Sequence, residues 1–409
     1  MRQAGYDTAI VGKWHLIAEP NFDYYAILPD QGSYFNPIFY VSNGPKPPRA
    51  FAMMRSGPWD DCSTLRAAGY DSMHSTDAVT ELALDWLSQH TKADRPFFLM
   101  LHFKAPHDNF ENAERYDFLY DKTDIPEPPS LWTRGNHGPI GREQYGTSVG
   151  KRWKDRNMGH HMFVDPNLPD TQYKETAYQR YLKKYLRCVK GVDDAVGRVT
   201  GWLEKTGQLD KTLVVYTSDQ GLLLGEHDYI DKRWMYEESM RMPFIVRYPK
   251  AVKPGSVNDD LIANIDFAPT LLAMVGTEAP GDMQGRSFLP MLRGEPAPKD
   301  WRTGIYYRYW LHTTSHANPA HWGIRTKQYK LIFFCGLPLD VPYAVKQPVE
   351  PYWELYDLQR DPYEMNNVYA DPDYAQVRET LKQQLLELKR QFKDTDEKYP
   401  ELAAIRQVD

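Results

Sequence analysis

The chain has 409 residues, of which 42% are hydrophobic, and a formal net charge of −6. This size suits an α/β enzyme with a packed subdomain, and the charge gives no basic footprint for nucleic acid. No stretch approaches the apolar length of a membrane span. The three cysteines are widely spaced, so they predict neither a disulfide framework nor a CxxC metal site. We therefore expect no nucleic-acid or membrane partner.

Up to residue 294 the predicted elements alternate strands with helices, which is typical of a largely parallel, covered sheet. In chain order they are a strand at 8–11, a helix at 76–89, a strand at 96–103, a long amphipathic helix at 178–203, strands at 212–217 and 243–248, and a helix at 266–275 that Asp266 would cap. Beyond Gly294, short β-rich runs and a final helix predict a small antiparallel sheet with a covering helix. We expect two domains, 1–297 and 298–409.

The apolar strand at 212–217 leads directly into Asp219 and Gln220, and a glycine turn follows. In an open α/β sheet, ligands bind beyond the carboxyl ends of the strands. Two oxygen donors at that point suit a hard cation such as Ca²⁺ or Mg²⁺ rather than zinc. The alternative is an aspartate that only caps a turn.

Three further segments end in Lys or His. Lys13 and His15 follow the first strand, and residues at i and i+2 of an extended segment point the same way. His107 follows the strand at 96–103, and Lys232 comes soon after the Asp-Gln pair. Together these groups predict an anion pocket built on a metal. The irregular stretch 108–169 leaves this pocket and is predicted to line the substrate.

At these residues the chain resembles type I sulfatases of the alkaline-phosphatase-like superfamily. The matching runs, in family order, are Gly5–Leu16 (GYDTAIVGKWHL), Phe103–His107 (FKAPH), Ser218–Gly221 (SDQG), Leu224–His227 (LGEH) and Asp231–Lys232. Residues 354–362 (ELYDLQRDP) resemble the family's C-terminal subdomain. The resemblance implies an alkaline-phosphatase-like mixed, largely parallel sheet covered by helices, with a small C-terminal antiparallel sheet and helix.

The resemblance also implies roles for single residues. Asp219 and Gln220 would complete a calcium shell, with Mg²⁺ as the other candidate, although many relatives have Asn in place of Gln220. Lys13 and Lys232 would clamp sulfate oxygens. His15 would steer the nucleophile, and His107 would protonate the leaving group.

For the substrate, the chain is similar to the N-acetylglucosamine-6-sulfatase-like branch, which acts on sulfated glycosaminoglycan or mucin-type sugars. His316 and His321, which precede Gly323, lie where that branch places sugar-contacting histidines, and Arg325 belongs to the same segment. The alternative is that both are ordinary loop histidines.

The family's nucleophile, a formylglycine made from Cys or Ser in a Cys/Ser-x-Pro-x-Arg motif, lies upstream of the block at 5–16. An earlier strand ends in two calcium-binding aspartates. Both elements are absent from this chain, so we expect no turnover from it as written. Cys62 precedes Arg66 at the motif's spacing, but Thr64 replaces the proline, so we interpret Cys62 as a loop residue.

Loss of a central strand predicts exposed sheet edges and self-association. The family is usually periplasmic, secreted or lysosomal, and the compartment of this chain is left open. Two rival functions remain. One is a phosphate-ester or phosphonate hydrolase of the same superfamily, which the upstream nucleophile would distinguish. The other is a non-catalytic sugar-binding remnant.

Overall fold

The computed structural model describes residues 1–42, 73–90, 95–132, 138, 145–152, 154 and 156–405. Two compact units interleave along the chain. Unit 1 comprises Met1–Ile125, Gln179–Leu213 and Met274–Thr277, and unit 2 comprises Pro126–Tyr178, Val214–Ala273 and Glu278–Asp409. The predicted domain boundary between residues 297 and 298 stays a prediction. Cys62 lies outside the described residues.

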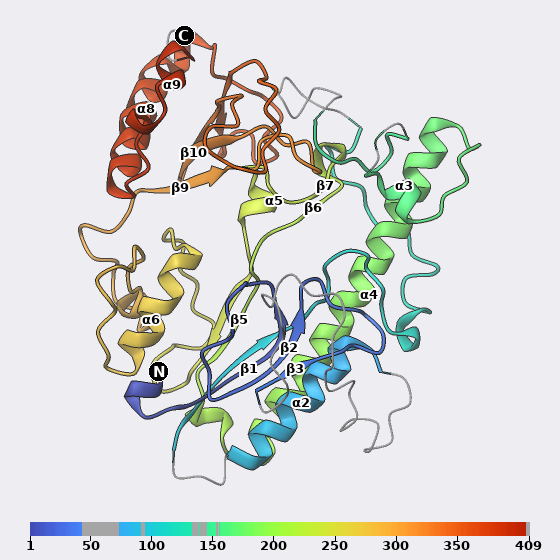
Figure 1. Ribbon diagram of the computed structural model, residues 1–409, viewed down its shortest axis with the longest axis vertical. Coiled ribbons are helices and arrows are strands. Elements are labelled where there is room, and N and C mark those ends of the chain that lie inside the picture. The colour runs from blue at the N-terminus through green and yellow to red at the C-terminus, as the bar shows by residue number, and fades with distance from the viewer. Residues whose placement is uncertain are drawn as a thin grey trace. The chain divides into compact units, whose positions relative to one another are not determined.

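Unit 1 contains a four-stranded sheet in the order β3-β2-β1-β4 (Figure 1). Its strands are β1 (Asp7–Trp14), β2 (Tyr24–Pro29), β3 (Tyr40–Val41) and β4 (Phe97–His102). The central strand β1 runs parallel to both β2 and β4, whereas β3 is antiparallel to β2. The sheet is therefore mixed and largely parallel, as expected.

The central strand β1 is apolar because a strand inside a parallel sheet is covered on both faces. Ala9, Ile10 and Val11 have 0% exposure. Near the carboxyl end, Gly12 has a φ of +113°, and a Cβ there would lie 1.8 Å from the carbonyl oxygen of His102 in β4. Glycine is thus required where β1 and β4 come closest, next to the polar residues that both strands deliver.

Two helices pack on the sheet of unit 1. They are α2 (Ser75–His90) and the long α4 (Asp170–Lys205), whose residues up to Tyr178 belong to unit 2. Side chains from both helices join one apolar cluster around Ala9, namely Trp86, Leu87, Val199 and Trp202. The predicted helices at 76–89 and 178–203 are confirmed, the second with an earlier start.

The first strands of unit 2 along the chain form two antiparallel pairs. β5 (Val214–Thr217) pairs with β8 (Phe244–Arg247), and β6 (Leu223–Leu224) pairs with β7 (Ile230–Asp231). Both strands that were predicted at 212–217 and 243–248 are confirmed. Within the described ranges, β5 and β8 form a sheet of two strands and are not part of the larger parallel sheet.

The four-stranded sheet of unit 2 is antiparallel throughout, in the order β12-β11-β10-β9. Its strands are β9 (Gly304–Tyr309), β10 (His321–Thr326), β11 (Tyr329–Phe334) and β12 (Tyr352–Asp357). Helix α8 (Ala375–Gln391) packs on it, with Leu381 and Leu385 each 3% exposed in the shared core. The predicted C-terminal sheet with a covering helix is confirmed.

The remaining helices are short. They are α3 (Met158–His161), α5 (Glu237–Met240), α6 (Phe267–Met274), α7 (Leu289–Leu292) and α9 (Glu401–Ile405). The predicted capping of α6 by Asp266 is wrong. Its carboxylate accepts hydrogen bonds from the backbone N–H groups of Ala263 and Arg286, at 2.7 and 2.8 Å, and pairs with Arg302. Asp266 therefore ties three segments together.

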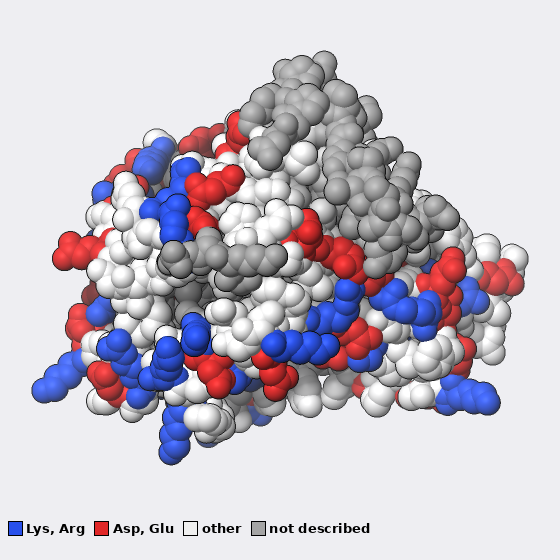
Figure 2. All heavy atoms as spheres, turned by 90° about the horizontal axis from the view of Figure 1, so that it is seen from below, with Lys and Arg blue, Asp and Glu red and all other residues white. Residues whose placement is uncertain are grey.

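Two observations concern the apolarity of the helices and the charge on one face. Within the described part of the chain, no helix is both long enough and apolar enough to cross a membrane. On the face shown in Figure 2, acidic and basic side chains are interspersed among the described residues, and no broad basic area is visible there.

Candidate active site

The sequence-predicted site residues are divided between the two units, and each set is described by itself. Unit 1 holds Lys13, His15 and His107, and unit 2 holds Asp219, Gln220, Lys232, His316, His321 and Arg325.

In unit 1, the end of β1 directs two side chains to the same turn. The Lys13 Nζ donates to Gln31 Oε1 at 3.1 Å, and His15 Nε2 lies 3.3 Å from Asp30 Oδ1. Asp30 and Gln31 directly follow β2, so the side chains at i and i+2 point the same way, as predicted. His15 is half-exposed, with 50% of its side chain accessible.

His107 lies in the loop after β4. Its Nδ1 is 2.5 Å from Asp108 Oδ1, and its backbone carbonyl accepts a hydrogen bond from the Tyr34 hydroxyl. Lys104, three residues earlier, is buried and donates from Nζ to the Gln31 carbonyl at 2.8 Å. Burial lowers the pKa of Lys104. This lysine thus ties the loop after β4 to the turn that Lys13 and His15 contact.

In unit 2, Asp219 and Gln220 follow β5. Asp219 is exposed, and Gln220 is half-buried. The Gln220 amide nitrogen donates to the Ser239 carbonyl at 2.5 Å, and the Gly221 N–H donates to the same oxygen at 3.0 Å. A Cβ at Gly221 would lie 2.1 Å from the Glu238 carbonyl oxygen, so the turn depends on glycine.

A carboxylate and an amide oxygen at a strand end fit a hard divalent cation. No group of three or more His, Cys, Asp or Glu side chains that could hold a metal occurs among the described residues. Asp219 and Gln220 can therefore supply part of a coordination shell, and Ca²⁺ requires six to eight oxygens.

Lys232 belongs to a cluster of charged side chains around Asp231, which is 12% exposed. The Lys232 Nζ lies 3.1 Å from Asp231 Oδ1, and Arg233 pairs with Oδ2 of the same carboxylate. Arg156 and His316 approach Oδ2 to 3.9 and 3.5 Å. We call these five residues the site cluster. It sets three permanent cations around one carboxylate, an arrangement that can attract an anion.

The charges of the site cluster shift two pKa values. Burial alone would raise the pKa of Asp231, but Lys232 and Arg233 outweigh it, so the pKa is lowered. Burial lowers the pKa of His316 to about 4, and the Arg233 charge adds to this effect. Near neutral pH, His316 is therefore an uncharged ring, and its Nε2 accepts a hydrogen bond from Arg156 at 2.8 Å.

The backbone beneath the site cluster adopts a costly conformation. Asp231 and Arg233 have φ angles of 84° and 87°, in the left-handed region that non-glycine residues rarely enter. Each such residue costs about 1–3 kcal/mol, and such residues concentrate at functional sites. In this turn the side chains of three consecutive residues, Asp231, Lys232 and Arg233, contact one another.

His321 is a correction to the sequence analysis. It is 0% exposed at the start of β10, and its ring packs against Trp234, Tyr307 and Phe334. Its Nδ1 lies 2.7 Å from the Pro319 carbonyl, and burial lowers its pKa to about 4. A ring without accessible surface cannot contact a sugar, so His321 is a core residue. His316, in contrast, joins the site cluster.

Arg325 is bound within unit 2 by a carboxylate. Its Nε and Nη2 donate to Glu237 at 3.1 and 2.9 Å. Lys330 lies 3.0 Å from Glu237 and 2.6 Å from Glu364. We call these four residues the buried network. The predicted substrate contact of Arg325 stays a prediction.

Sequence reasoning missed the site-cluster roles of Asp231, Arg233 and Arg156. Asp231 and Arg233 flank Lys232, so their proximity was a usable signal. Arg156 lies 75 positions earlier, in the irregular stretch that was predicted to line the substrate, and no periodicity marks it.

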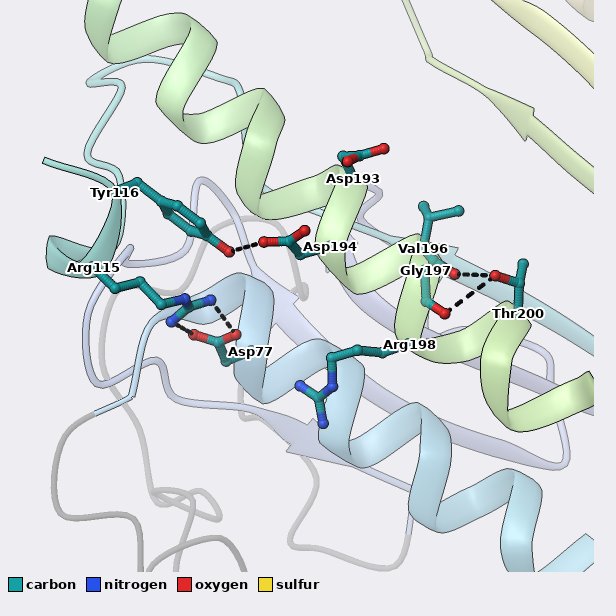
Figure 3. Close-up of a pocket in the computed structure, with 9 residues that line it drawn as sticks. All are labelled: Asp77, Arg115, Tyr116, Asp193, Asp194, Val196, Gly197, Arg198 and Thr200. Atoms are coloured by element: carbon teal, nitrogen blue, oxygen red, sulfur yellow. Dashed lines mark hydrogen bonds and ion pairs between the residues drawn. The ribbon is translucent and has the colours of Figure 1, made fainter. Parts of the chain in front are cut away.

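Unit 1 also contains an open groove of about 750 Å³ (Figure 3). It is lined by α2, α4 and the residues around Tyr116. Arg115 binds Asp77 in a bidentate pair at 2.7 and 2.8 Å, and the Tyr116 hydroxyl donates to Asp194 at 2.7 Å. These pairs join α2 and α4 to the segment at 114–116. None of the predicted site residues lines the groove.

Comparison with known proteins identifies the family. Residues 1–277 match the sulfatase family model, and residues 225–391 match the model for the C-terminal part of N-sulphoglucosamine sulphohydrolase. An N-acetylglucosamine-6-O-sulfatase from Bacteroides thetaiotaomicron is 36% identical over 97% of this chain and 72% of its own length. The chain belongs to the sulfatase family, which are sulfuric ester hydrolases. Membership implies a divalent metal and a formylglycine nucleophile.

Other relatives agree. The human N-acetylglucosamine-6-sulfatase is 28% identical over 78% of this chain, which spans 55% of that relative. A protein solved in complex with its substrate, D-glucosamine-2-N,6-O-disulfate, superposes with a TM-score of 0.81 at 36% identity, covering 98% of this chain and 82% of its own. A phosphonate monoester hydrolase from Silicibacter pomeroyi has a TM-score of 0.67 at 22% identity. That likeness shows the fold alone, and the phosphonate alternative is not favoured.

Proposed function

We propose that this protein acts on 6-O-sulfated N-acetylglucosamine within sulfated glycosaminoglycan or mucin-type saccharides. The observation that carries the proposal is the site cluster, in which three cations surround one carboxylate. A sulfated sugar offers both an anion for the cations and hydroxyl groups for the carboxylate. The substrates named for the two N-acetylglucosamine-6-sulfatases support this choice.

Sulfate ester cleavage builds negative charge on the leaving oxygen, so fixed cations and a proton donor are what this chain has to supply. In our proposal, Lys232 of unit 2 binds sulfate oxygens, and Lys13 is the anion-binding group that unit 1 offers. His107, held beside Asp108, donates the proton to the leaving oxygen, and His15 orients the attacking group. The formylglycine of the family supplies the nucleophile when it is present.

We further propose Ca²⁺ as the divalent ion, with Asp219 and Gln220 as two of its oxygen ligands. Carboxylate and carboxamide oxygens are ligands that calcium accepts at several geometries, and Mg²⁺ is the alternative. The bond from the Gln220 amide nitrogen to Ser239 leaves the carbonyl oxygen of that amide as the coordinating atom. Asp219→Asn should weaken Ca²⁺ binding, measured by calorimetry.

Isothermal titration with N-acetylglucosamine-6-sulfate and with unsulfated N-acetylglucosamine tests the substrate without requiring turnover. We expect binding of the sulfated sugar, with at least tenfold weaker binding of the unsulfated one. Lys232→Met should lose most of the difference, and Lys253→Met, an exposed lysine of unit 2, should keep it. Equal binding of both sugars, or an unchanged affinity in Lys232→Met, would overturn the proposal.

A further inference from the structure

Large apolar side chains are exposed on two short segments of unit 2. Trp310 and Leu311 are 51% and 40% exposed, and Tyr343 and Val345 are 84% and 42% exposed. The Val345 N–H donates to the His312 carbonyl at 2.9 Å, so the segments lie side by side. We call these four side chains the aromatic surface. Exposed apolar side chains gathered in this way mark binding sites more often than single ones.

The buried side chain of His312 fixes this region. Its Nδ1 accepts from the Ala320 N–H at 3.2 Å, and its Nε2 donates to the Gln347 carbonyl at 3.1 Å. Burial lowers the pKa of His312, so the neutral ring fits one accepting and one donating nitrogen. The aromatic surface is therefore held by internal bonds and is not a loose loop.

The Trp310 ring is also positioned from one side. The guanidinium carbon of Arg308 lies 5.2 Å from its ring centre, and the Arg308 side chain is 4% exposed and paired with Asp394. A cation–π contact covers one face of an aromatic ring. About half of Trp310 is exposed, so the residue keeps surface on which a ligand can pack. A fixed, half-open indole loses little freedom when a flat ligand stacks on it.

The aromatic surface is continuous with the site cluster along one loop. His316, whose Nε2 lies 3.5 Å from Asp231 Oδ2, comes six residues after Trp310. Six residues of extended chain span at most about 20 Å, which limits the distance from Trp310 to His316. The loop folds back through bonds from Thr313 N–H to the Asn318 carbonyl and from Ala317 N–H to the Thr314 carbonyl. The distance is therefore shorter than that limit, within the length of a short oligosaccharide.

The charge beside the aromatic surface suits a sulfated chain. Lys346 is exposed and directly follows Val345. Its ammonium group donates to the Val341 carbonyl at 3.4 Å, and this exposed bond can be exchanged for one to a sulfate group on a neighbouring sugar. The ring carbons of that sugar present an apolar face to Trp310 and Tyr343.

We propose that the aromatic surface binds the sugars that follow the terminal sulfated residue of an oligosaccharide. The inference rests on the proposed function, because the terminal sugar is placed at the site cluster. It makes this protein selective for chain ends over free monosaccharides. The recognising contacts are stacking on Trp310 and Tyr343 and charge pairing with Lys346.

The test is calorimetry with two probes, N-acetylglucosamine-6-sulfate and a tetrasaccharide that carries this sugar at its non-reducing end. Wild type should bind the tetrasaccharide roughly tenfold tighter, as expected for one or two stacked rings. Trp310→Ala and Tyr343→Ala should lose most of this gain and bind the monosaccharide as wild type does. Trp310→Phe should keep most of the gain. Tyr363→Ala removes another exposed aromatic side chain of unit 2, 49% exposed, and should change neither affinity.

The outcomes separate the two proposals. If the monosaccharide binds but the tetrasaccharide binds no tighter, or if the gain survives in both alanine variants, the aromatic surface is not a sugar site and the proposed function stands. If the monosaccharide does not bind, the proposed function fails. In that case, tetrasaccharide binding that Trp310→Ala abolishes would still support a sugar site at the aromatic surface. Any other result would overturn that site.

Discussion

The site cluster and the buried network lie close together in the sequence of unit 2, yet they differ in charge balance and exposure. In the buried network, Lys330 and Glu364 are 0% and 1% exposed, Arg325 and Glu237 are 21% and 19% exposed, and two cations face two carboxylates. In the site cluster, three cations face one carboxylate, and Lys232 and Arg233 are each 22% exposed. A set with equal numbers of cations and carboxylates around a fully buried lysine stabilises the fold. Three cations around one partly exposed carboxylate are suited to a charged ligand.

The largest effect is expected from breaking the buried network. Lys330→Met removes the cation beside the Glu364 carboxylate, which is 1% exposed, whereas Glu237 keeps its pair with Arg325. Removing one partner of a buried ion pair costs about 3–5 kcal/mol of unfolding free energy. Urea denaturation followed by circular dichroism measures this loss.

The matched control is Lys327→Met, in the turn between β10 and β11. Lys327 pairs with Asp260 at 2.9 Å, but its side chain is 58% exposed. A surface pair contributes about 0–1 kcal/mol. If both variants lost the same stability, the network would not be the structural element that its burial indicates.

A smaller effect with two readouts is expected from Asp231→Asn. Loss of the carboxylate leaves three cations close together and should lower the unfolding free energy by about 2 kcal/mol. The same change should tighten binding of inorganic sulfate severalfold at low ionic strength, because one negative charge is gone, and added salt should reduce the gain. Sulfate affinity that stays unchanged would argue against anion binding at this cluster.

Titration of Glu354 and titration of His316 should change the stability with pH in opposite directions. Burial raises the pKa of Glu354, whose carboxylate accepts hydrogen bonds from Tyr236 and Tyr356, to about 7. The folded state then holds more protons than the unfolded state between the ordinary pKa of 4.5 and about 7, so this group lowers stability as pH rises through that window. The pKa of His316 is lowered to about 4, so between pH 4 and 6.5 the unfolded state binds more protons than the folded state. This group therefore lowers stability as pH falls from 6.5 to 4.

Glu354→Gln should therefore gain stability relative to wild type as pH rises to about 7 and show a constant difference above it. His316→Gln should remove the loss on the acid side. Urea denaturation across this pH range checks both variants. Parallel stability curves for wild type and Glu354→Gln would mean that Glu354 titrates as an ordinary carboxyl group.

Much of the fold was predictable because its signals are local. The 3.6-residue period fixed α2, α4 and α8, and the apolar run 8–11 marked the central strand β1. Asp266 shows the limit: an aspartate before an apolar helix fits a cap, but its partners Arg286 and Arg302 are distant in sequence. Long-range partners of this kind leave no trace in local composition.

For the site, the shared direction of Lys13 and His15 was predictable because residues at i and i+2 of an extended segment point the same way, and the roles of Lys13, His15 and Lys232 stay predictions. Prediction failed for His321, because a histidine before a strand looks the same in sequence whether its ring faces solvent or the core. Arg156 was missed because the fold alone brings it to Asp231. Charge balance, which separates the two regions compared above, likewise becomes visible only in three dimensions.

The most direct measurement compares Arg233→Met with Arg325→Met, using the same two readouts for each: affinity for N-acetylglucosamine-6-sulfate and unfolding free energy. Arg233→Met should weaken sugar binding by the folded protein at least tenfold, in addition to the stability lost with its pair to Asp231. Arg325→Met should lower stability by about 2 kcal/mol, since it breaks the bidentate pair with Glu237, and leave the affinity of the folded protein unchanged. The account would be contradicted if Arg325→Met weakened binding as much as Arg233→Met while keeping wild-type stability.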